Sequence, residues 1–136
     1  YGKIGSIITI DREYENIIDI IKDVAMHIVA MNPKYLDLQA IPETILSNEQ
    51  KLHSEMIRKK HINKKEAIIT NIINSHMENF YKSNVLLKQA FVKNPKLTIS
   101  EFINDVFVLL DFVRFESGEV KWIILYRGNN NVRWYI

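Results

Sequence analysis

The feature that most constrains the fold is a change in apolar period between two neighbouring segments. Residues 4–10 form a β-branched apolar run that is typical of a strand. In the next segment, 13–31, apolar residues recur at helical spacings of four and three. They are Ile17, Ile21, Val24 and Ile28. The helix should end at Asn32, because a residue that precedes proline disfavours helical backbone.

The middle of the chain is expected to form an antiparallel helical hairpin, over about 42–82, that projects from the body. Its first helix, 42–60, carries a heptad-like row that we expect to pack on the second: Ile45, Glu49, Leu52 and Met56. The second helix, 64–82, has a face formed by Ile69, Ile72, Ile73, His76 and Phe80. Because His76 falls within that face, we interpret it as a packing residue.

The remaining segments predict a short helix and a β-hairpin. Thr98 and Glu101 have the spacing of a capping box, which starts a helix. Segments 106–116 and 121–127 are rich in β-branched and aromatic residues and flank a turn that contains Gly118. The predicted fold class is therefore α+β, with a small antiparallel sheet covered by helices.

Composition limits the class of protein. The 136 residues suit one domain, and the absence of cysteine excludes disulfides and thiol nucleophiles. Eighteen basic against sixteen acidic residues give a net charge of +2, which is too balanced for a typical nucleic-acid-binding domain. The abundance of Ile, Lys and Asn indicates an AT-rich genome. It weakly favours a mitochondrion or plastid, with bacterial cytoplasm as the alternative.

Residues that could carry chemistry are sparse. The four histidines have no metal-ligand spacing, and no phosphate-binding glycine loop or nucleophile motif is present. We therefore expect no enzyme activity, no catalytic residues, no cofactor and no metal.

Two surface features keep alternatives open. Met26 and His27 lie on the flank of the first helix, either as accidental neighbours of its apolar face or as a contact patch. The lysine-rich segment 58–65 falls at the tip of the helical hairpin. It is either a solvated tip or a weak contact for RNA or an acidic surface.

Four segments in order resemble the core domain of translation elongation factor Ts, over residues 1 to about 120. Residues 3–10 are similar to the family's R-I-G-V-L-V strand, and 23–36 to its D-I-A-M-H-I-A-A-x-x-P-x-Y-L segment. Residues 86–99 resemble L-x-x-Q-P-F-V-x-x-P-x-x-T-V, although Ala90 replaces the usual proline. Residues 113–119 resemble the closing F-x-R-F-E-V-G-E.

The chain also departs from the family pattern. It contains no counterpart of the ubiquitin-associated-like domain or of the T-D-F-V-A motif, whose Phe wedges near the magnesium site of elongation factor Tu. Asp111-Phe112-Val113 imitates that motif only in letters. We therefore expect part of a longer factor, with 1–120 as the core subdomain and 121–136 as a strand or tail of uncertain homology.

The resemblance implies a guanine-nucleotide exchange factor that binds elongation factor Tu and promotes GDP release. It implies no direct nucleotide binding and no membrane, and makes nucleic acid an unlikely partner. The alternatives are an interaction module without exchange activity or a small RNA-binding domain. By resemblance, Ile4, Gly5 and His27 match family positions that press on elongation factor Tu, and Met26 adjoins them. A glycine within a strand also permits close backbone approach, or forms a bulge without a partner.

Overall fold

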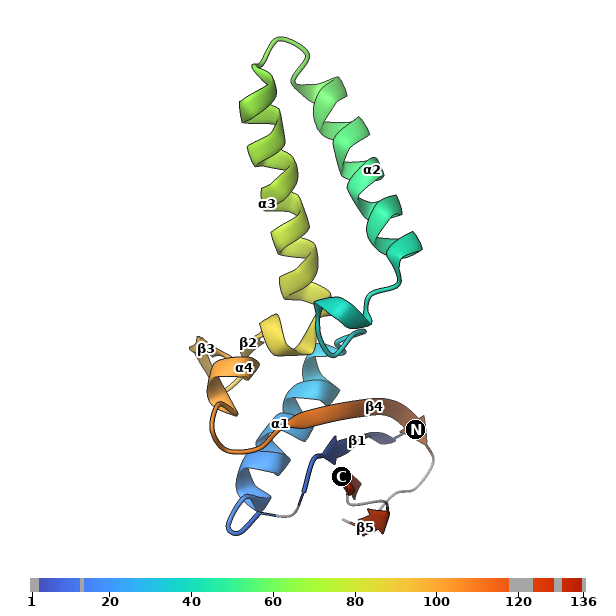
Figure 1. The fold of residues 1–136 in the computed structure, drawn as a ribbon, viewed down its shortest axis with the longest axis vertical. Helices are drawn as coiled ribbons and strands as arrows, with labels where there is room; N and C mark the ends of the chain where they lie inside the picture. The colour runs from blue at the N-terminus through green and yellow to red at the C-terminus, as the bar shows by residue number, and fades with distance from the viewer. Residues whose placement is uncertain (1–2, 13, 118–123, 129–130, 136) are drawn as a thin grey trace.

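The structure is a computed structural model that describes residues 3–12, 14–117, 124–128 and 131–135. Its main feature is a four-stranded antiparallel sheet with the order β4-β1-β6-β5 (Figure 1). The strands are β1 (Lys3–Ile10), β4 (Leu109–Ser117), β5 (Ile124–Gly128) and β6 (Asn131–Tyr135). The predicted strand over 4–10 is therefore confirmed, and it lies inside the sheet.

Helix α1 (Ile18–Met31) packs on β1 and forms the main core with it. Its predicted apolar row is confirmed, since Ile21, Val24 and Ile28 are fully buried. The helix ends as expected at Asn32, whose left-handed backbone has φ of 47° and whose N–H donates to the Ile28 carbonyl. Its start is later than predicted, because Asn16, with φ of 56°, precedes the first helical turn.

The predicted hairpin between 106–116 and 121–127 is wrong. β4 and β5 lie at opposite edges of the sheet, so they are not paired with each other. β4 pairs along the full length of β1, and β5 pairs with β6 from Ile124↔Tyr135 to Gly128↔Asn131. The turn residue on which the prediction depended, Gly118, lies outside the described residues. A turn motif in the sequence indicates a local hairpin, but it cannot show that β4 and β6 pair with the two edges of β1.

The helical hairpin is confirmed. Helices α2 (Glu43–Lys60) and α3 (Glu66–Asn84) run antiparallel and project from the body (Figure 1). Near the tip they share a small buried cluster of Ile57, Ile69 and Ile73. Farther down, His76 is half-buried and its ring stacks on His53, with centroids 5.2 Å apart, as expected of a packing residue.

The row of α2 predicted to face α3 is wrong by one residue. Ile45, Leu52 and Met56 are 38%, 52% and 55% exposed. The adjacent row, which has the same spacings of seven and four, is more buried and consists of Leu46, His53 and Ile57. A shift of one residue turns a helix by about 100°, so two overlapping rows competed in the sequence. Glu49, in the predicted row, instead contacts His53, with 3.3 Å between Oε2 and Nε2.

Short elements connect the hairpin to the body. They are η1 (Leu38–Ala40), η2 (Leu86–Lys88), β2 (Ala90–Phe91), β3 (Asn94–Thr98) and α4 (Ile99–Phe102). The predicted N-cap is confirmed, since Thr98 Oγ1 accepts from the Glu101 N–H at 3.2 Å, and the Glu101 carboxylate reaches back to accept from the Thr98 hydroxyl at 3.2 Å. Within the described part of the chain, no helix combines the length and apolarity needed to cross a membrane.

Candidate partner-binding surface

The four residues singled out in the sequence belong to two adjacent elements. Ile4 and Gly5 lie on β1, and Met26 and His27 lie on α1. The strand and the helix are joined between these positions, because the Ser6 hydroxyl donates to the Ala25 carbonyl at 3.3 Å. The structure therefore brings the two segments together at one end of the helix-on-strand contact.

Two of the four residues present side chains at the surface. Ile4 is 43% exposed near the start of β1, and Met26 is 53% exposed on α1. Gly5 is buried and pairs with Phe115 of β4, so only its backbone could approach a partner. Exposed apolar side chains of this size can anchor a protein interface. Here the strand and the helix to which they belong keep them in fixed positions.

His27 is in the interior, and only 1% of it is exposed. Its Nε2 lies 2.9 Å from Gln89 Oε1, and its Nδ1 accepts from the Val92 N–H at 3.3 Å. Because Nδ1 is an acceptor, the proton is on Nε2, which donates to Gln89. Gln89 is also fully buried, and its Nε2 donates to the Ser83 carbonyl at 2.9 Å. This chain of bonds ties α1 to the ends of α3 and η2.

The structure thus separates Met26 from its neighbour. One residue along a helix is a rotation of about 100°, which turns Met26 outward and His27 toward the segment 89–92. A direct contact between the His27 side chain and a partner would require that segment to move. The role of all four residues at an interface stays a prediction.

Sequence reasoning missed Gln89. Its side chain fixes the tautomer of His27, although the two residues are far apart along the chain. The available signal was a glutamine between the apolar residues Leu87 and Phe91. A side-chain amide that is buried there requires hydrogen-bond partners. No pattern in the sequence alone could have identified His27 as that partner.

Burial lowers the pKa of His27, because the charged imidazolium is poorly solvated there, and the hydrogen bond that His27 donates to Gln89 opposes this shift only in part. The folded protein therefore binds this proton less readily than the unfolded chain, whose histidines titrate near pH ~6.5. Above that pH, the neutral His27 makes its full contribution to the free energy of unfolding. As the pH falls through ~6.5 toward the lower folded pKa, the unfolded state gains the proton first and stability is lost.

We expect the urea midpoint of the protein to fall between pH 7.5 and pH 5.5, and to fall less in His27→Gln, because glutamine cannot titrate. The measurement is urea unfolding followed by circular dichroism at several pH values. The pKa of His61 is also lowered, but His61 is present in both proteins, and the pKa of Asp11 is lowered from near 3.8, so its titration lies below this window. Equal pH dependence in the two proteins would contradict the assignment to His27.

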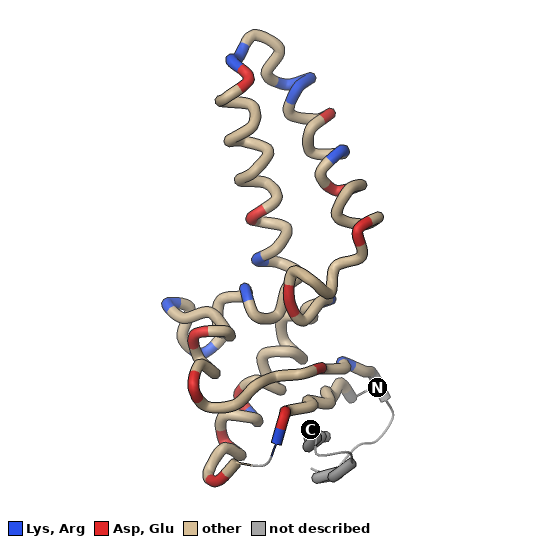
Figure 2. Tube along the Cα trace, in the orientation of Figure 1, with Lys and Arg blue, Asp and Glu red and all other residues tan. Residues whose placement is uncertain are grey.

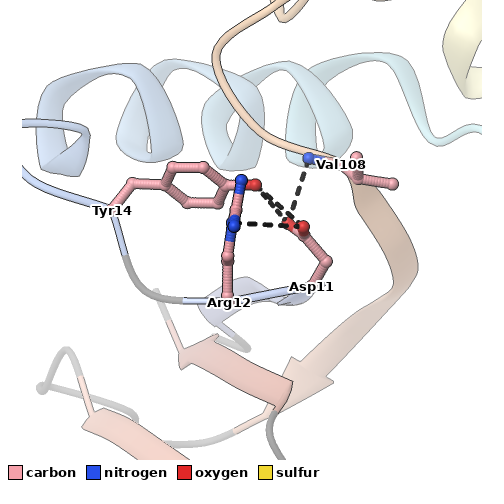
Figure 3. Close-up of polar contacts among 4 residues, drawn as sticks. All are labelled: Asp11, Arg12, Tyr14 and Val108. Atoms are coloured by element: carbon pink, nitrogen blue, oxygen red, sulfur yellow. Dashed lines mark hydrogen bonds and ion pairs between the residues drawn. The ribbon is translucent and has the colours of Figure 1, made fainter.

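A polar cluster fixes the end of β1 next to the start of β4 (Figure 3). Asp11 accepts from the Tyr14 hydroxyl at 2.8 Å and from the Val108 N–H at 3.2 Å. Partial burial alone would raise the pKa of Asp11, but these hydrogen bonds and the nearby Arg12 hold it below its usual value. The groups satisfy one another, so we interpret the cluster as a structural junction.

An open groove of about 460 Å³ runs beside this junction and includes Arg12, Tyr14 and Phe107 in its lining. The titratable residues in its lining are Arg12, Tyr14 and Asp105. Among the described residues, no group of three or more histidine or acidic side chains is placed to hold a metal ion.

Comparison with known proteins agrees with the resemblance seen in the sequence. The family model described as Elongation factor TS matches residues 1–119. Elongation factor Ts of Halothermothrix orenii is 38% identical over 120 residues, and that of Nitratiruptor sp. is 35% identical over 129 residues. Each alignment covers 87% of this chain and, respectively, 40% and 42% of the relative.

The chain therefore spans about two fifths of the length of these curated relatives. A further relative, elongation factor Ts of Thermoanaerobacter sp., is 29% identical over 133 residues, and 63% of it is covered. All three are bacterial proteins. They do not support the mitochondrial or plastid origin expected from composition.

Proposed function

Because the chain belongs to the elongation factor Ts family, we propose that it binds the GTPase elongation factor Tu and serves guanine-nucleotide exchange in translation. The observation that carries this proposal is the exposure of Ile4 and Met26 on a rigid strand–helix unit within the matched residues. In this proposal, the side chains of Ile4 and Met26 contact the partner, and the buried residues Gly5 and His27 hold β1 and α1 in place.

The proposed mechanism needs no covalent chemistry. An exchange factor deforms the phosphate and Mg²⁺ region of its GTPase, and Mg²⁺ tolerates little displacement of its octahedral ligands. Coupling between the two sites is reciprocal, so a factor that weakens GDP binding is itself bound less tightly when GDP is present. This role agrees with the expectation that the protein is not an enzyme and has no cofactor.

The contribution of this chain would be mainly binding. Phe112, which imitates the family's wedge residue in letters, lies on β4 and packs half-buried against the core. A side chain held there cannot insert into a partner. We therefore propose that residues 1–136 bind elongation factor Tu but accelerate GDP release only weakly.

Two measurements test this function. By calorimetry, we expect the chain to bind nucleotide-free elongation factor Tu at least about tenfold more tightly than the GDP-bound form. By stopped flow, we expect a fluorescent GDP analogue to leave elongation factor Tu no more than about tenfold faster when the chain is added, which is the acceleration that this coupling gives if it acts on release alone. A plain interaction module would bind both forms equally. Fast GDP release would contradict the role assigned to Phe112.

Two further assignments are proposals as well. The matched residues end at 119, whereas β6 lies beyond them and pairs with β1. We propose that residues 121–136 add strands to a family core that ends near residue 120. The bacterial relatives favour the bacterial cytoplasm as the location.

A further inference from the structure

Charge is segregated along the molecule in a way that the total of +2 hides. Residues 56–77, around the tip of the helical hairpin, contain five basic residues and one acidic residue, for a net charge of +4. The rest of the chain therefore has a net charge of −2. Figure 2 shows the basic positions gathered at the far end of the hairpin. The balanced composition consequently does not exclude a polyanionic partner for this end of the protein.

One of the five cations is used within the hairpin. Arg58 on α2 forms a two-pronged ion pair with Glu66 on α3, with 2.9 Å between Nη1 and Oε2, which closes the tip. The other four cations are exposed, and none forms an ion pair with a described residue. They are Lys59, Lys60, Lys64 and Lys65. We call these four residues the tip lysines.

The stability of the helical hairpin accounts for the positions of only two of the four tip lysines. Lys59 and Lys60 are in the last turn of α2, where cations interact favourably with the helix dipole. Lys64 and Lys65 immediately precede the first turn of α3, where the dipole disfavours cations, and Lys65 provides no side-chain cap. Charges that oppose local stability are typical of functional positions.

Two of the tip lysines affect the protonation of the histidine between them. The pKa of His61, which lies between them, is lowered first by partial desolvation and then by Lys64 and Lys60. The 18 residues of α2 span about 27 Å, or roughly three Debye lengths at physiological salt. The positive field of the tip is therefore not cancelled by the net negative remainder.

We propose that the tip lysines bind the phosphate backbone of a nucleic-acid double helix without reading its bases, and the choice of RNA as that helix rests on the translational role proposed above. No Phe, Tyr or Trp occurs between Tyr35 and Phe80, so the tip offers a single strand only the partly buried ring of His61 to stack on. Arg58, the arginine among residues 56–77, is paired with Glu66. The remaining cations of the tip are lysines, which contact phosphate as point charges. An acidic protein surface is the competing partner, but the tip lacks the free arginine and aromatic anchors that dominate protein interfaces.

The proposal is tested by fluorescence anisotropy with two labelled 20-base-pair RNA duplexes of unrelated sequence. For four phosphate contacts, log affinity against log salt has a slope of about −3 to −4. Affinity should therefore fall roughly 100-fold from 50 to 200 mM KCl, equally for both duplexes. The variant Lys59→Gln, Lys60→Gln, Lys64→Gln, Lys65→Gln should lose this binding.

A matched control removes the same charge elsewhere. Its four substitutions are Lys22→Gln, Lys34→Gln, Lys51→Gln and Lys82→Gln, all at exposed lysines. The control should retain most of the affinity and the slope, and circular dichroism should show equal helix content in both variants. The proposal is overturned if the parent does not bind at 50 mM KCl or if both variants bind alike. It is also overturned if polyglutamate of equal charge competes as well as unlabelled duplex. None of these outcomes bears on binding to elongation factor Tu.

Discussion

Replacing His27 with alanine is expected to lower the free energy of unfolding by about 2–4 kcal/mol, one of the largest effects available in this chain. The substitution leaves a cavity at a side chain that is only 1% exposed. It also removes the partner of the Gln89 amide oxygen and the acceptor for the Val92 N–H. Gln89 is fully buried, so water cannot replace its lost bond without further opening, whereas the bond of the Val92 N–H is only partly buried. The measurement is the urea midpoint at pH 7.5.

Met26→Ala is the matched control, because Met26 is the adjacent residue on the same helix and is 53% exposed. A surface truncation of this kind usually changes stability by no more than about 0.5 kcal/mol. Gln89→Ala should resemble His27→Ala, since it breaks the same chain of bonds from the other end. If His27→Ala and Met26→Ala were equally stable, the buried position of His27 would be wrong.

The contrast between these neighbours marks the limit of sequence reasoning at the candidate site. The apolar period placed Ile21, Val24 and Ile28 in the core, as the structure confirms. It could not determine what covers the two flanks of the helix, because that depends on the distant segment 89–92. The sequence pattern therefore groups Met26 with His27, whereas the structure assigns Met26 to the surface and His27 to a buried network.

The same limit explains the errors in the fold. Several elements with a clear local pattern were predicted, including β1, the N-cap at Thr98 and the two helices of the hairpin, whereas the β2–β3 pair was missed. The errors concern which elements meet. β4 pairs with β1 and not with β5, and α2 turns its 46–53–57 row toward α3 in place of the row one residue earlier. The pairing of strands and the rotation of a helix are set by tertiary contacts. The local sequence pattern fits either arrangement equally well, so it cannot distinguish between them.

The double substitution Ile4→Asp with Met26→Asp is expected to weaken binding to nucleotide-free elongation factor Tu by at least about 100-fold, without a comparable loss of stability. Each aspartate would place a charge where the proposed interface excludes water, and central apolar contacts typically contribute about 2 kcal/mol or more when they are hot spots. Both side chains are substantially exposed in the free protein, so neither charge is forced into the core. Calorimetry measures the affinity, and urea unfolding checks the fold.

The control for this substitution is Val113→Asp with Met56→Asp. It also replaces one exposed aliphatic residue on a strand and one exposed methionine on a helix, which are 48% and 55% exposed. These residues lie on β4 and α2, outside the proposed contact surface. If the control weakened binding as much as Ile4→Asp with Met26→Asp, general surface charge would account for the loss. If neither variant altered the affinity, the strand–helix unit of β1 and α1 would not be the surface that binds the GTPase.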